Sequence, residues 1–177
     1  MTEGHIPINL HNWDLHRAAE ENRADIARLL ISAGADIEAA KIQERRGPIH
    51  NAAQADEVDK LQLLLEEGVY LDVRDEVGNT PLKFAAAVGS MNAARLLLQK
   101  GANVNAADNR GETPLMSTVR FDRNLFLAKL LIDNGANIEA QDIDGNRPLL
   151  IAAEGYKNNA LAQITRLLIH YGANVDA

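Results

Sequence analysis

Apolar residues along this chain gather in short blocks with helical spacing, and the blocks come in pairs. In the clearest stretch, 75–107, the apolar positions of the two blocks are Leu82, Ala85, Ala86, Ala94, Leu96, Leu97 and Leu98. Intervals of three and four residues place such side chains on one face of a helix. Gly89-Ser90 separates the blocks, and Gly101 ends the second because glycine readily adopts the left-handed conformation of a helix C-terminus. The pattern predicts one helix before Gly89 and another from about Met91 to Gly101.

The residues before the first block predict a turn and a defined helix start. The segment 75–79 contains Gly78 and Asn79, and both residue types tolerate positive φ. Thr80 can cap the helix through its hydroxyl, and Pro81 suits the first helical position because no N–H is needed there. Helices shorter than about 12–15 residues are marginal in water. Each unit of turn, helix and helix must therefore be stabilised by stacking on its neighbours.

This unit recurs along the chain at a nearly constant period. Proline recurs at positions 48, 81, 114 and 148, in steps of 33, 33 and 34 residues. The closing glycine recurs as Gly34, Gly68, Gly101, Gly135 and Gly172. A fixed period of this length is the signature of a repeat array. We expect a lead-in at 1–13 followed by five units at 14–41, 42–74, 75–107, 108–141 and 142–177.

The phrases of the unit resemble those of the ankyrin repeat. They are Thr-Pro-Leu at 80–82 and 113–115, the paired alanines, the double leucine, and Gly-Ala-Asn-Val-Asn-Ala at 101–106. The resemblance covers residues 14–177 and implies an all-α fold, a solenoid of helix-turn-helix units with projecting β-turns or hairpins. It also implies that His16 and His50 are structural hydrogen-bonding residues. Stacked units lie about 10 Å apart, too far for these two side chains to share one zinc ion.

Some units depart from this pattern. Gly47 and Arg147 replace the capping Thr, so those helix starts should be weaker. One extra residue near Asp122-Arg123 lengthens the connection in the fourth unit, and about four around 156–159 lengthen it in the fifth.

The last unit has no evidently polar closing helix, although terminal repeats usually need a polar outer face. This ending favours a piece of a longer array, whereas the lead-in before the first unit favours a complete small protein.

Composition narrows the classes of function. The chain has 177 residues, no cysteine and a formal net charge of −7. The lack of cysteine excludes disulfides and thiolate chemistry, and the negative charge argues against nucleic-acid binding through phosphate neutralisation. No apolar run approaches the length of a membrane span and no secretory signal opens the chain, so we expect a cytoplasmic monomer without membrane contact. Residues 1–76 carry 16 acidic and 8 basic side chains, against 9 and 10 in 77–177, so basic partner groups should be attracted to the N-terminal part.

The candidate chemical motifs are better explained as structure. The stretch 142–146 alternates oxygen-bearing residues like a calcium loop, but Arg147 and Ala153 occupy the positions where that loop needs Gly and Glu, which favours a repeat turn. The basic cluster of Lys41 and 43–46 is best interpreted as a solvated turn. The chain contains none of the common motifs for hydrolases, metalloproteases, phosphate loops or dinucleotide binding. We therefore expect no enzyme activity, no metal and no cofactor.

The resemblance implies that a partner is bound by the turn tips and by the exposed side of the first helices, which together line a concave surface. The tip positions are Gln43, Glu44, Arg46, Glu76, Val77, Asn79, Asn109, Arg110, Glu112, Ile143, Asp144 and Asn146. The helix positions are Glu20, Glu21, Gln54, Ala55, Ala87, Val88, Arg120, Phe121 and Glu154. Four of these residues are apolar where stacking does not require it: Val77, Val88, Phe121 and Ile143. Single exposed apolar side chains are common, but a group of them flanked by Arg110 and Arg120 suggests a binding centre.

Two functions remain open at this level. The first is a non-catalytic adaptor or inhibitor that occupies the surface of another protein. The second is a recognition module that targets a larger catalytic or effector polypeptide. If the region of Phe121 is not used for binding, the acidic end around Glu20 and Glu21 is the next candidate.

Overall fold

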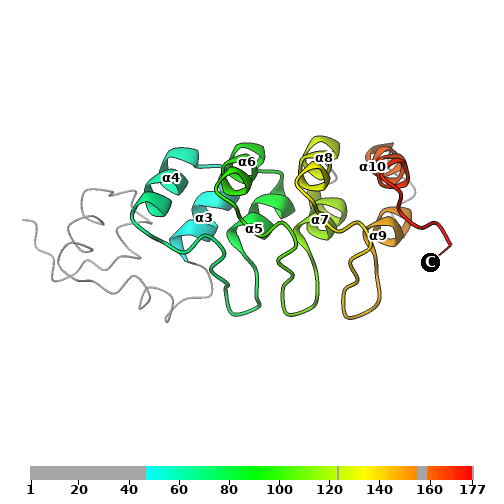
Figure 1. The fold of residues 1–177 in the computed structure, drawn as a ribbon, viewed down its shortest axis with the longest axis horizontal. Helices are drawn as coiled ribbons and strands as arrows, with labels where there is room; N and C mark the ends of the chain where they lie inside the picture. The colour runs from blue at the N-terminus through cyan, green and yellow to red at the C-terminus, as the bar shows by residue number, and fades with distance from the viewer. Residues whose placement is uncertain (1–46, 123, 155–158, 177) are drawn as a thin grey trace, which may run out of the picture.

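The computed structural model describes residues 47–176 except 123 and 155–158, and this part of the chain consists of paired helices joined by turns (Figure 1). The elements are α3 (Pro48–Gln54), α4 (Val58–Glu66), α5 (Pro81–Val88), α6 (Met91–Gln99), α7 (Pro114–Ser117), the π-helical segment η3 (Thr118–Asp122), α8 (Leu125–Asp133), α9 (Pro148–Glu154) and α10 (Asn159–His170). No strand occurs in these described ranges. The first predicted unit, including His16, and the basic cluster at 41–46 lie outside the described residues.

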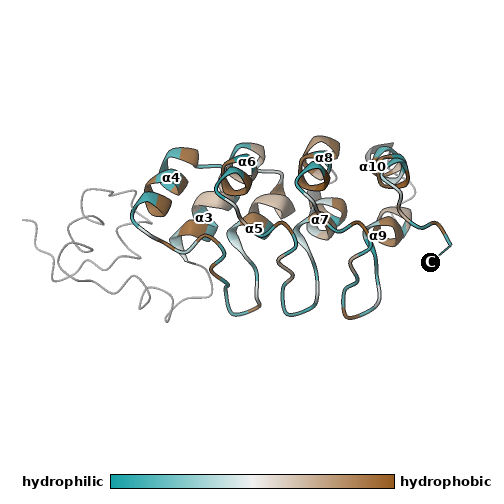
Figure 2. Cartoon of the chain, viewed as in Figure 1, coloured by the Kyte–Doolittle hydropathy of each residue, from teal (hydrophilic) through white to brown (hydrophobic). Residues whose placement is uncertain are grey.

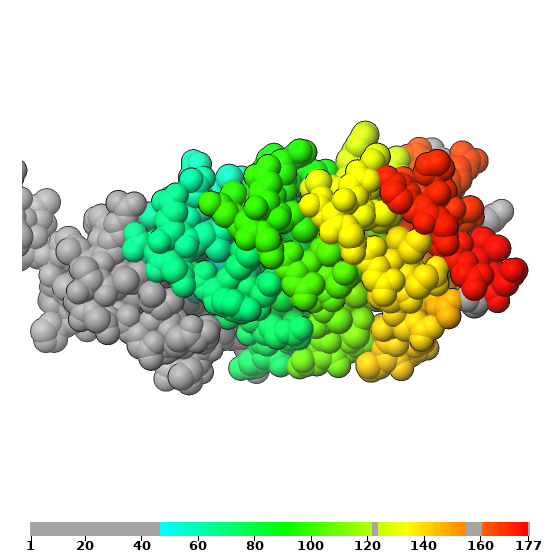
Figure 3. Space-filling model, viewed as in Figure 1, coloured from blue at the N-terminus to red at the C-terminus, as the bar shows by residue number. Residues whose placement is uncertain are grey.

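The four helix pairs stack side by side in an elongated row (Figure 1). The inner helices α3, α5, α7 and α9 contact one another in sequence, and the outer helices α4, α6, α8 and α10 form a second layer. Long turns project from the inner side between successive pairs (Figure 1), and the pairs pack into one continuous body (Figure 3). The architecture confirms the predicted all-α solenoid. Within the described residues, each helix is too short or too polar to cross a lipid bilayer.

The core is a strip of small and branched apolar side chains between the two layers. Leu82, Ala85, Ala86 and Leu97 are fully buried, as the helical spacing predicted. Apolar colour concentrates on the helices, whereas the projecting turns are mostly hydrophilic (Figure 2). Because each short helix makes few hydrogen bonds of its own, burial between neighbouring pairs supplies the stability of the row.

Most helix ends follow the sequence-based prediction. The hydroxyls of Thr80 and Thr113 accept hydrogen bonds from the backbone N–H groups of Lys83 at 3.3 Å and Met116 at 3.4 Å. Gly101 closes the second helix of its unit with a φ of 91°. Gly47 supplies no side-chain cap, as expected, but its own N–H donates to Nδ1 of His50 at 3.0 Å. The imidazole therefore satisfies the N–H of the capping residue, which is a different group from the one that a threonine hydroxyl would bind.

The extra residue of the fourth unit is absorbed inside a helix rather than in a loop. Sequence analysis placed it between the two helices, but the structure shows a π-helical segment, η3, which directly follows the four-residue α7. A π-turn accommodates one additional residue without ending the helix. Leu127 and Leu131 of the following α8 remain fully buried, so stacking stays in register. The predicted insertion at 156–159 falls almost entirely outside the described residues.

Candidate functional site

Three projecting turns share one hydrogen-bonding pattern, which begins at Asp75, Asp108 and Asp142. In each turn the aspartate carbonyl accepts from the N–H of the glycine three residues later, at 2.9, 3.0 and 3.0 Å. The aspartate carboxylate accepts two further backbone N–H groups, from the residues two and four positions on. A type I turn closed by a glycine with positive φ gives this geometry, which confirms the predicted β-turns. The tips are therefore held in place by their own backbone before any partner arrives.

Successive turns are also bonded to one another. The N–H of Asn109 donates to the carbonyl of Val77 at 3.0 Å, and the N–H of Ile143 donates to the carbonyl of Arg110 at 2.9 Å. The approach is close at Gly78, where an added Cβ would lie 2.6 Å from Oδ1 of Asn109. We call residues 75–79, 108–112 and 142–146 the turn row. The backbone hydrogen bonds make the turn row a continuous edge of the molecule.

Asp142 shows that the 142–146 segment is a repeat turn. Its carboxylate accepts from the N–H of Asp144 at 3.0 Å, and from the N–H and side-chain amide of Asn146 at 2.8 and 3.0 Å. Burial raises the pKa of Asp142, but these hydrogen bonds and the nearby Arg120 outweigh it, so the net pKa lies below the usual value. The oxygens that suggested calcium binding are used to shape the turn.

A buried cation connects two neighbouring turns. Nζ of Lys83 donates to Oδ2 of Asp108 at 2.9 Å, to Oε2 of Glu112 at 3.4 Å and to Oδ1 of Asn79 at 2.9 Å. Only 8% of the Lys83 side chain and 9% of the Asp108 side chain are exposed. Burial raises the pKa of Asp108, but the hydrogen bonds from Lys83 and from backbone N–H groups outweigh it and lower the pKa overall. The ion pair fixes the turn of one unit to the inner helix of the unit before it.

His50 has a comparable structural role one unit earlier. Its Nδ1 accepts from Gly47, so Nε2 carries the proton and donates toward the carbonyls of Val73 at 3.0 Å and Asn79 at 3.2 Å. The side chain is buried, and its ring meets Phe84 edge-on at 5.4 Å between centroids. The geometry confirms the prediction that His50 is a structural hydrogen-bonding residue.

Both arginines proposed for the binding centre are paired within the molecule. Arg120 contacts Glu112 through Nε at 3.3 Å and Asp142 through Nη2 at 3.6 Å. Arg110 contacts Asp144 on the next turn at 3.4 Å, and both of these side chains are well exposed. Sequence analysis placed the two arginines beside a group of exposed apolar residues as part of a binding centre. The structure shows that Arg120 in particular is occupied by two carboxylates of its own chain.

The structure brings many of the predicted site residues together beside the turn row. A hollow of about 160 Å³ is lined by Arg110, Glu112, Arg120, Phe121, Asp142, Asp144 and Asn146. Asp142 was missed by sequence reasoning, although an aspartate opening each of the three turns was a visible signal. Three predicted residues, Gln43, Glu44 and Arg46, lie outside the described residues, as do Glu20 and Glu21.

The remaining predicted residues divide by exposure. The four apolar residues predicted to be free of stacking are exposed by 57%, 47%, 60% and 68%, in the order Val77, Val88, Phe121 and Ile143. The predicted polar residues that are exposed are Glu76, Asn109, Arg110, Asp144 and Glu154, and Ala55 is exposed as well. The partly buried ones are Gln54, Asn79, Ala87, Glu112, Arg120 and Asn146. The side chains of Asn79 and Asn146 donate to the carboxylates of Asp75 and Asp142, so they hold the turn in shape.

Comparisons with known proteins agree with this architecture. Residues 15–108 and 105–177 match the family described as "Ankyrin repeats (3 copies)". Over 75 residues the chain is 44% identical to human "Neurogenic locus notch homolog protein 2", a match that covers 41% of this chain and 3% of the relative. Over 84 residues it is 34% identical to "NF-kappa-B inhibitor cactus" of Drosophila melanogaster, which covers 44% of this chain and 17% of the relative.

The chain thus spans only a small fraction of the length of these relatives. The family match, in contrast, extends over nearly the whole sequence and includes every helix pair described above. Ankyrin repeats are a protein-interaction module. On the agreement of sequence period, helix pairs, turn geometry and family match, this chain belongs to the ankyrin repeat family.

Proposed function

We propose that this chain is a non-catalytic adaptor or inhibitor, a cytoplasmic monomer that binds another protein through the concave surface of its turn row and the exposed side of the inner helices. We call this the tip surface. Its exposed members are Glu76, Val77, Val88, Asn109, Arg110, Phe121, Ile143 and Asp144. Asn79, Glu112, Arg120 and Asn146 lie beneath these exposed residues and belong to the proposed surface as well. The proposal also includes Gln43, Glu44 and Arg46, which lie outside the described residues.

The observation that carries the proposal is the exposure of Phe121 beside a preorganised polar hollow. The side chain is 60% exposed and lines the hollow together with charged groups that hydrogen bonds and ion pairs hold in position. An aromatic side chain offers a large apolar area, and such anchors dominate the energy of protein interfaces. Because the surrounding turns are already ordered, binding pays little conformational entropy.

The charges around the hollow indicate what the partner presents. Three carboxylates and two guanidinium groups line it, so it has an excess of negative charge. Since Arg110 and Arg120 are paired with these carboxylates, a partner carboxylate would have to displace an existing contact. A partner with an apolar side chain next to a basic one fits Phe121 and the excess acid better.

An inhibitory mode is supported by one of the relatives. The cactus protein is named an inhibitor of NF-kappa-B, and it matches this chain over 84 residues. Inhibition of this kind needs only that the partner's surface be covered. The tip surface supplies an ordered apolar patch for that purpose without any catalytic group.

The test compares two exposed aromatic residues. We expect Phe121→Ala to leave the circular-dichroism spectrum and melting temperature nearly unchanged and to weaken binding of the natural partner by about 1–3 kcal/mol. Tyr70→Ala is the control, because Tyr70 is 61% exposed but does not belong to the tip surface. The partner is first captured with the wild-type chain and identified by mass spectrometry, and its affinity for each variant is measured by isothermal calorimetry.

Three outcomes separate the possibilities. Selective loss of binding in Phe121→Ala supports the tip surface. Equal affinity of Phe121→Ala and the wild type would refute it and direct attention to the acidic N-terminal end around Glu20 and Glu21. Unfolding of Phe121→Ala would contradict the exposure of this ring, and Ile143→Ser then tests the surface at a second exposed apolar position.

The alternative function is a recognition module that targets a larger catalytic or effector polypeptide. The notch relative favours it, because the region matching this chain makes up 3% of that protein. Sequencing the transcript that encodes this chain tests the alternative. An open reading frame that continues into a catalytic domain supports it, whereas a stop codon directly after Ala177 contradicts it.

A further inference from the structure

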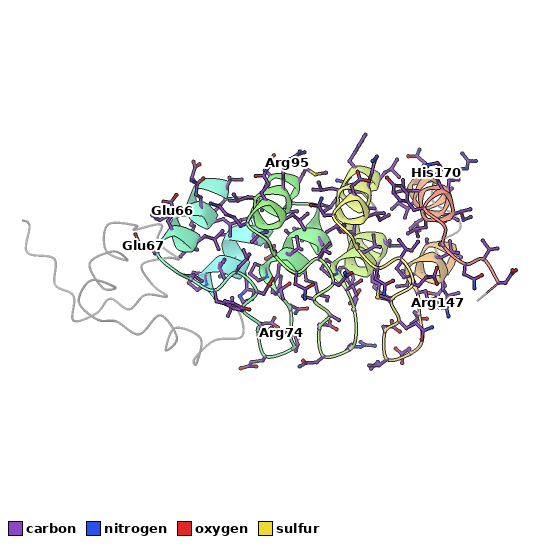
Figure 4. All side chains as sticks on the ribbon, viewed as in Figure 1. Glu66, Glu67, Arg74, Arg95, Arg147 and His170 are labelled. Carbon is purple, nitrogen blue, oxygen red and sulfur yellow. The ribbon has the colours of Figure 1, made fainter. Side chains whose placement is uncertain are left out.

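Three of the described outer helices together carry a net positive charge, unlike the rest of the chain. Among them, α6, α8 and α10 with their closing residues contain Arg95, Lys100, Lys129 and Arg166, against one acid, Asp133. The first outer helix of the described part, α4, has the opposite balance, and Glu66 and Glu67 mark its end (Figure 4). A net positive face is unusual in a chain whose formal charge is −7.

Three of the cations occupy one equivalent position. Arg95, Lys129 and Arg166 each lie six residues before the closing glycine of their unit, and all three side chains are exposed. Helices in contact lie about 8–10 Å apart, so the three groups form a line across α6, α8 and α10. Lys129 is engaged by Asp133 at 2.6 Å and Tyr171 at 3.2 Å, whereas Arg95 and Arg166 form no ion pair among the described residues.

An apolar side chain stands within this line. Phe126 lies on α8 and is 75% exposed, the largest exposure among the large hydrophobic residues described. The equivalent positions of the other outer helices are polar, namely Asp59, Asn92 and Gln163. Neither stacking nor helix formation requires phenylalanine there. An exposed aromatic ring on the central helix of a line of cations resembles the centre of an interface, where an apolar anchor is surrounded by charged rim residues.

We propose that the outer face, defined as Arg95, Phe126, Lys129 and Arg166, binds an acidic segment of another protein in which an apolar side chain lies between carboxylates. The carboxylates pair with Arg95 and Arg166, and the apolar side chain covers Phe126. Nucleic acid and anionic membranes are weaker fits, because an extended polyanion also meets the negative charge of the remaining molecule. The site is separate from the tip surface and does not depend on the proposed function.

The test uses a short fluorescein-labelled peptide in which glutamate alternates with leucine, and the same peptide with lysine in place of glutamate. Fluorescence anisotropy with the full chain at low ionic strength measures affinity, and amide shifts in NMR spectra locate the contact. We expect the acidic peptide to bind saturably, with shifts concentrated on α6, α8 and α10, and the basic peptide to leave these helices unperturbed. Arg95→Gln, Arg166→Gln and Phe126→Ala should each weaken binding about threefold to tenfold.

Arg74→Gln is the matched control. Arg74 is also exposed, but it lies toward the turns, whereas Arg95 lies on the outer-helix side (Figure 4). Both variants lose one positive charge, so only a specific outer face separates them. Equal weakening by Arg74→Gln and Arg95→Gln, absence of saturable binding, or shifts confined to the turns would each overturn the proposal. Tighter binding of heparin or of phosphatidylserine vesicles than of the acidic peptide, through the same residues, would also overturn it.

Discussion

The helix pairs α5–α6 and α9–α10 have similar sequences but different surroundings. The first is covered on both sides, and the second has a neighbour on one side only within the described residues (Figure 1). Four positions are buried in the unit of α5 and α6 but partly or largely exposed in the unit of α9 and α10. The equivalent residues are Leu82 and Leu149, Lys83 and Leu150, Ala86 and Ala153, and Val104 and Val175. Val104 is 9% exposed, for example, whereas Val175 is 63% exposed.

The difference shows that a position in this fold is buried because a neighbouring unit covers it, whichever residue occupies it. The exposed positions Leu149, Leu150, Ala153 and Val175 border a hollow of about 310 Å³ at the end of the row. A repeat array gains its stability from interfaces between units, so the same substitution should have a different cost in each pair. Paired substitutions can measure that difference directly.

The largest contrast is expected for the leucine that follows the helix-starting proline. Leu82→Ala should cost about 3–5 kcal/mol, because it removes a fully buried side chain and leaves a cavity between two units. Leu149→Ala should cost only about 1 kcal/mol, since one side of Leu149 already faces solvent. Urea denaturation followed by circular dichroism measures both values.

As a control, Leu97→Ala and Leu168→Ala should both cost about 2–5 kcal/mol, because both residues are fully buried. Equal costs for Leu82→Ala and Leu149→Ala would contradict the comparison.

A second contrast concerns the residue after that leucine. Lys83→Met should cost about 3 kcal/mol, because it leaves Asp108 and Glu112 with less compensation for their burial. Methionine fits the space, as Met116 occupies the equivalent position of α7 with full burial. Leu150→Met should change stability by less than about 0.5 kcal/mol, because Leu150 is largely exposed and has no such partner among the described residues. A small effect of Lys83→Met in urea denaturation would show that the ion pair contributes little.

The acid dependence of that cost tests its electrostatic origin. The pKa of Asp108 is lowered in the folded chain, so its stabilising effect is present above the ordinary value of 3.8 and is lost as the pH falls through the lowered pKa. We expect the difference in stability between the wild type and Lys83→Met to be full near neutral pH and to shrink below 3.8. Denaturation at a series of pH values measures it. A difference that stays constant into acid would assign the cost to packing.

The smallest contrast concerns the helix caps. Thr80→Ala should cost about 1 kcal/mol, because the hydroxyl caps α5. Arg147→Thr should gain less than about 0.5 kcal/mol, since the new cap is offset by lost contacts. Arg147 pairs with Glu139 at 3.4 Å, and the side-chain oxygen of Gln141, when turned toward Arg147, accepts from its Nη2 at 2.8 Å and its Nε at 2.9 Å. Differential scanning calorimetry of the two variants checks this, and a gain above 1 kcal/mol would restore the simple capping argument.

The sequence predicted those features that repeat and missed those that join one unit to the next. Helix ends, turn type and the buried faces follow from local spacing, as the caps at Thr80 and the burial of Leu97 illustrate. The ties from Lys83 to Asp108 and from Arg120 to Asp142 link residues in different units, and no local rule pairs them. The exposed position of Phe121 was anticipated, but the π-helical segment that carries it was not, because one extra residue fits equally well into a loop.

Because hydrogen bonds join the successive turns, the molecule should bend more easily in one direction than in the other. Backbone hydrogen bonds from Asn109 to Val77 and from Ile143 to Arg110 join successive turns along one edge, whereas the outer helices α8 and α10 are joined by an exposed side-chain hydrogen bond from Tyr171 to Asp133. Spreading the outer helices therefore breaks exposed side-chain bonds that water can replace, whereas spreading the turns breaks bonds of the backbone itself. Thermal bending should therefore hinge along the turn row. Pulsed electron-spin measurements would then give a broader distance distribution between labels on α6 and α10 than between labels on successive turns.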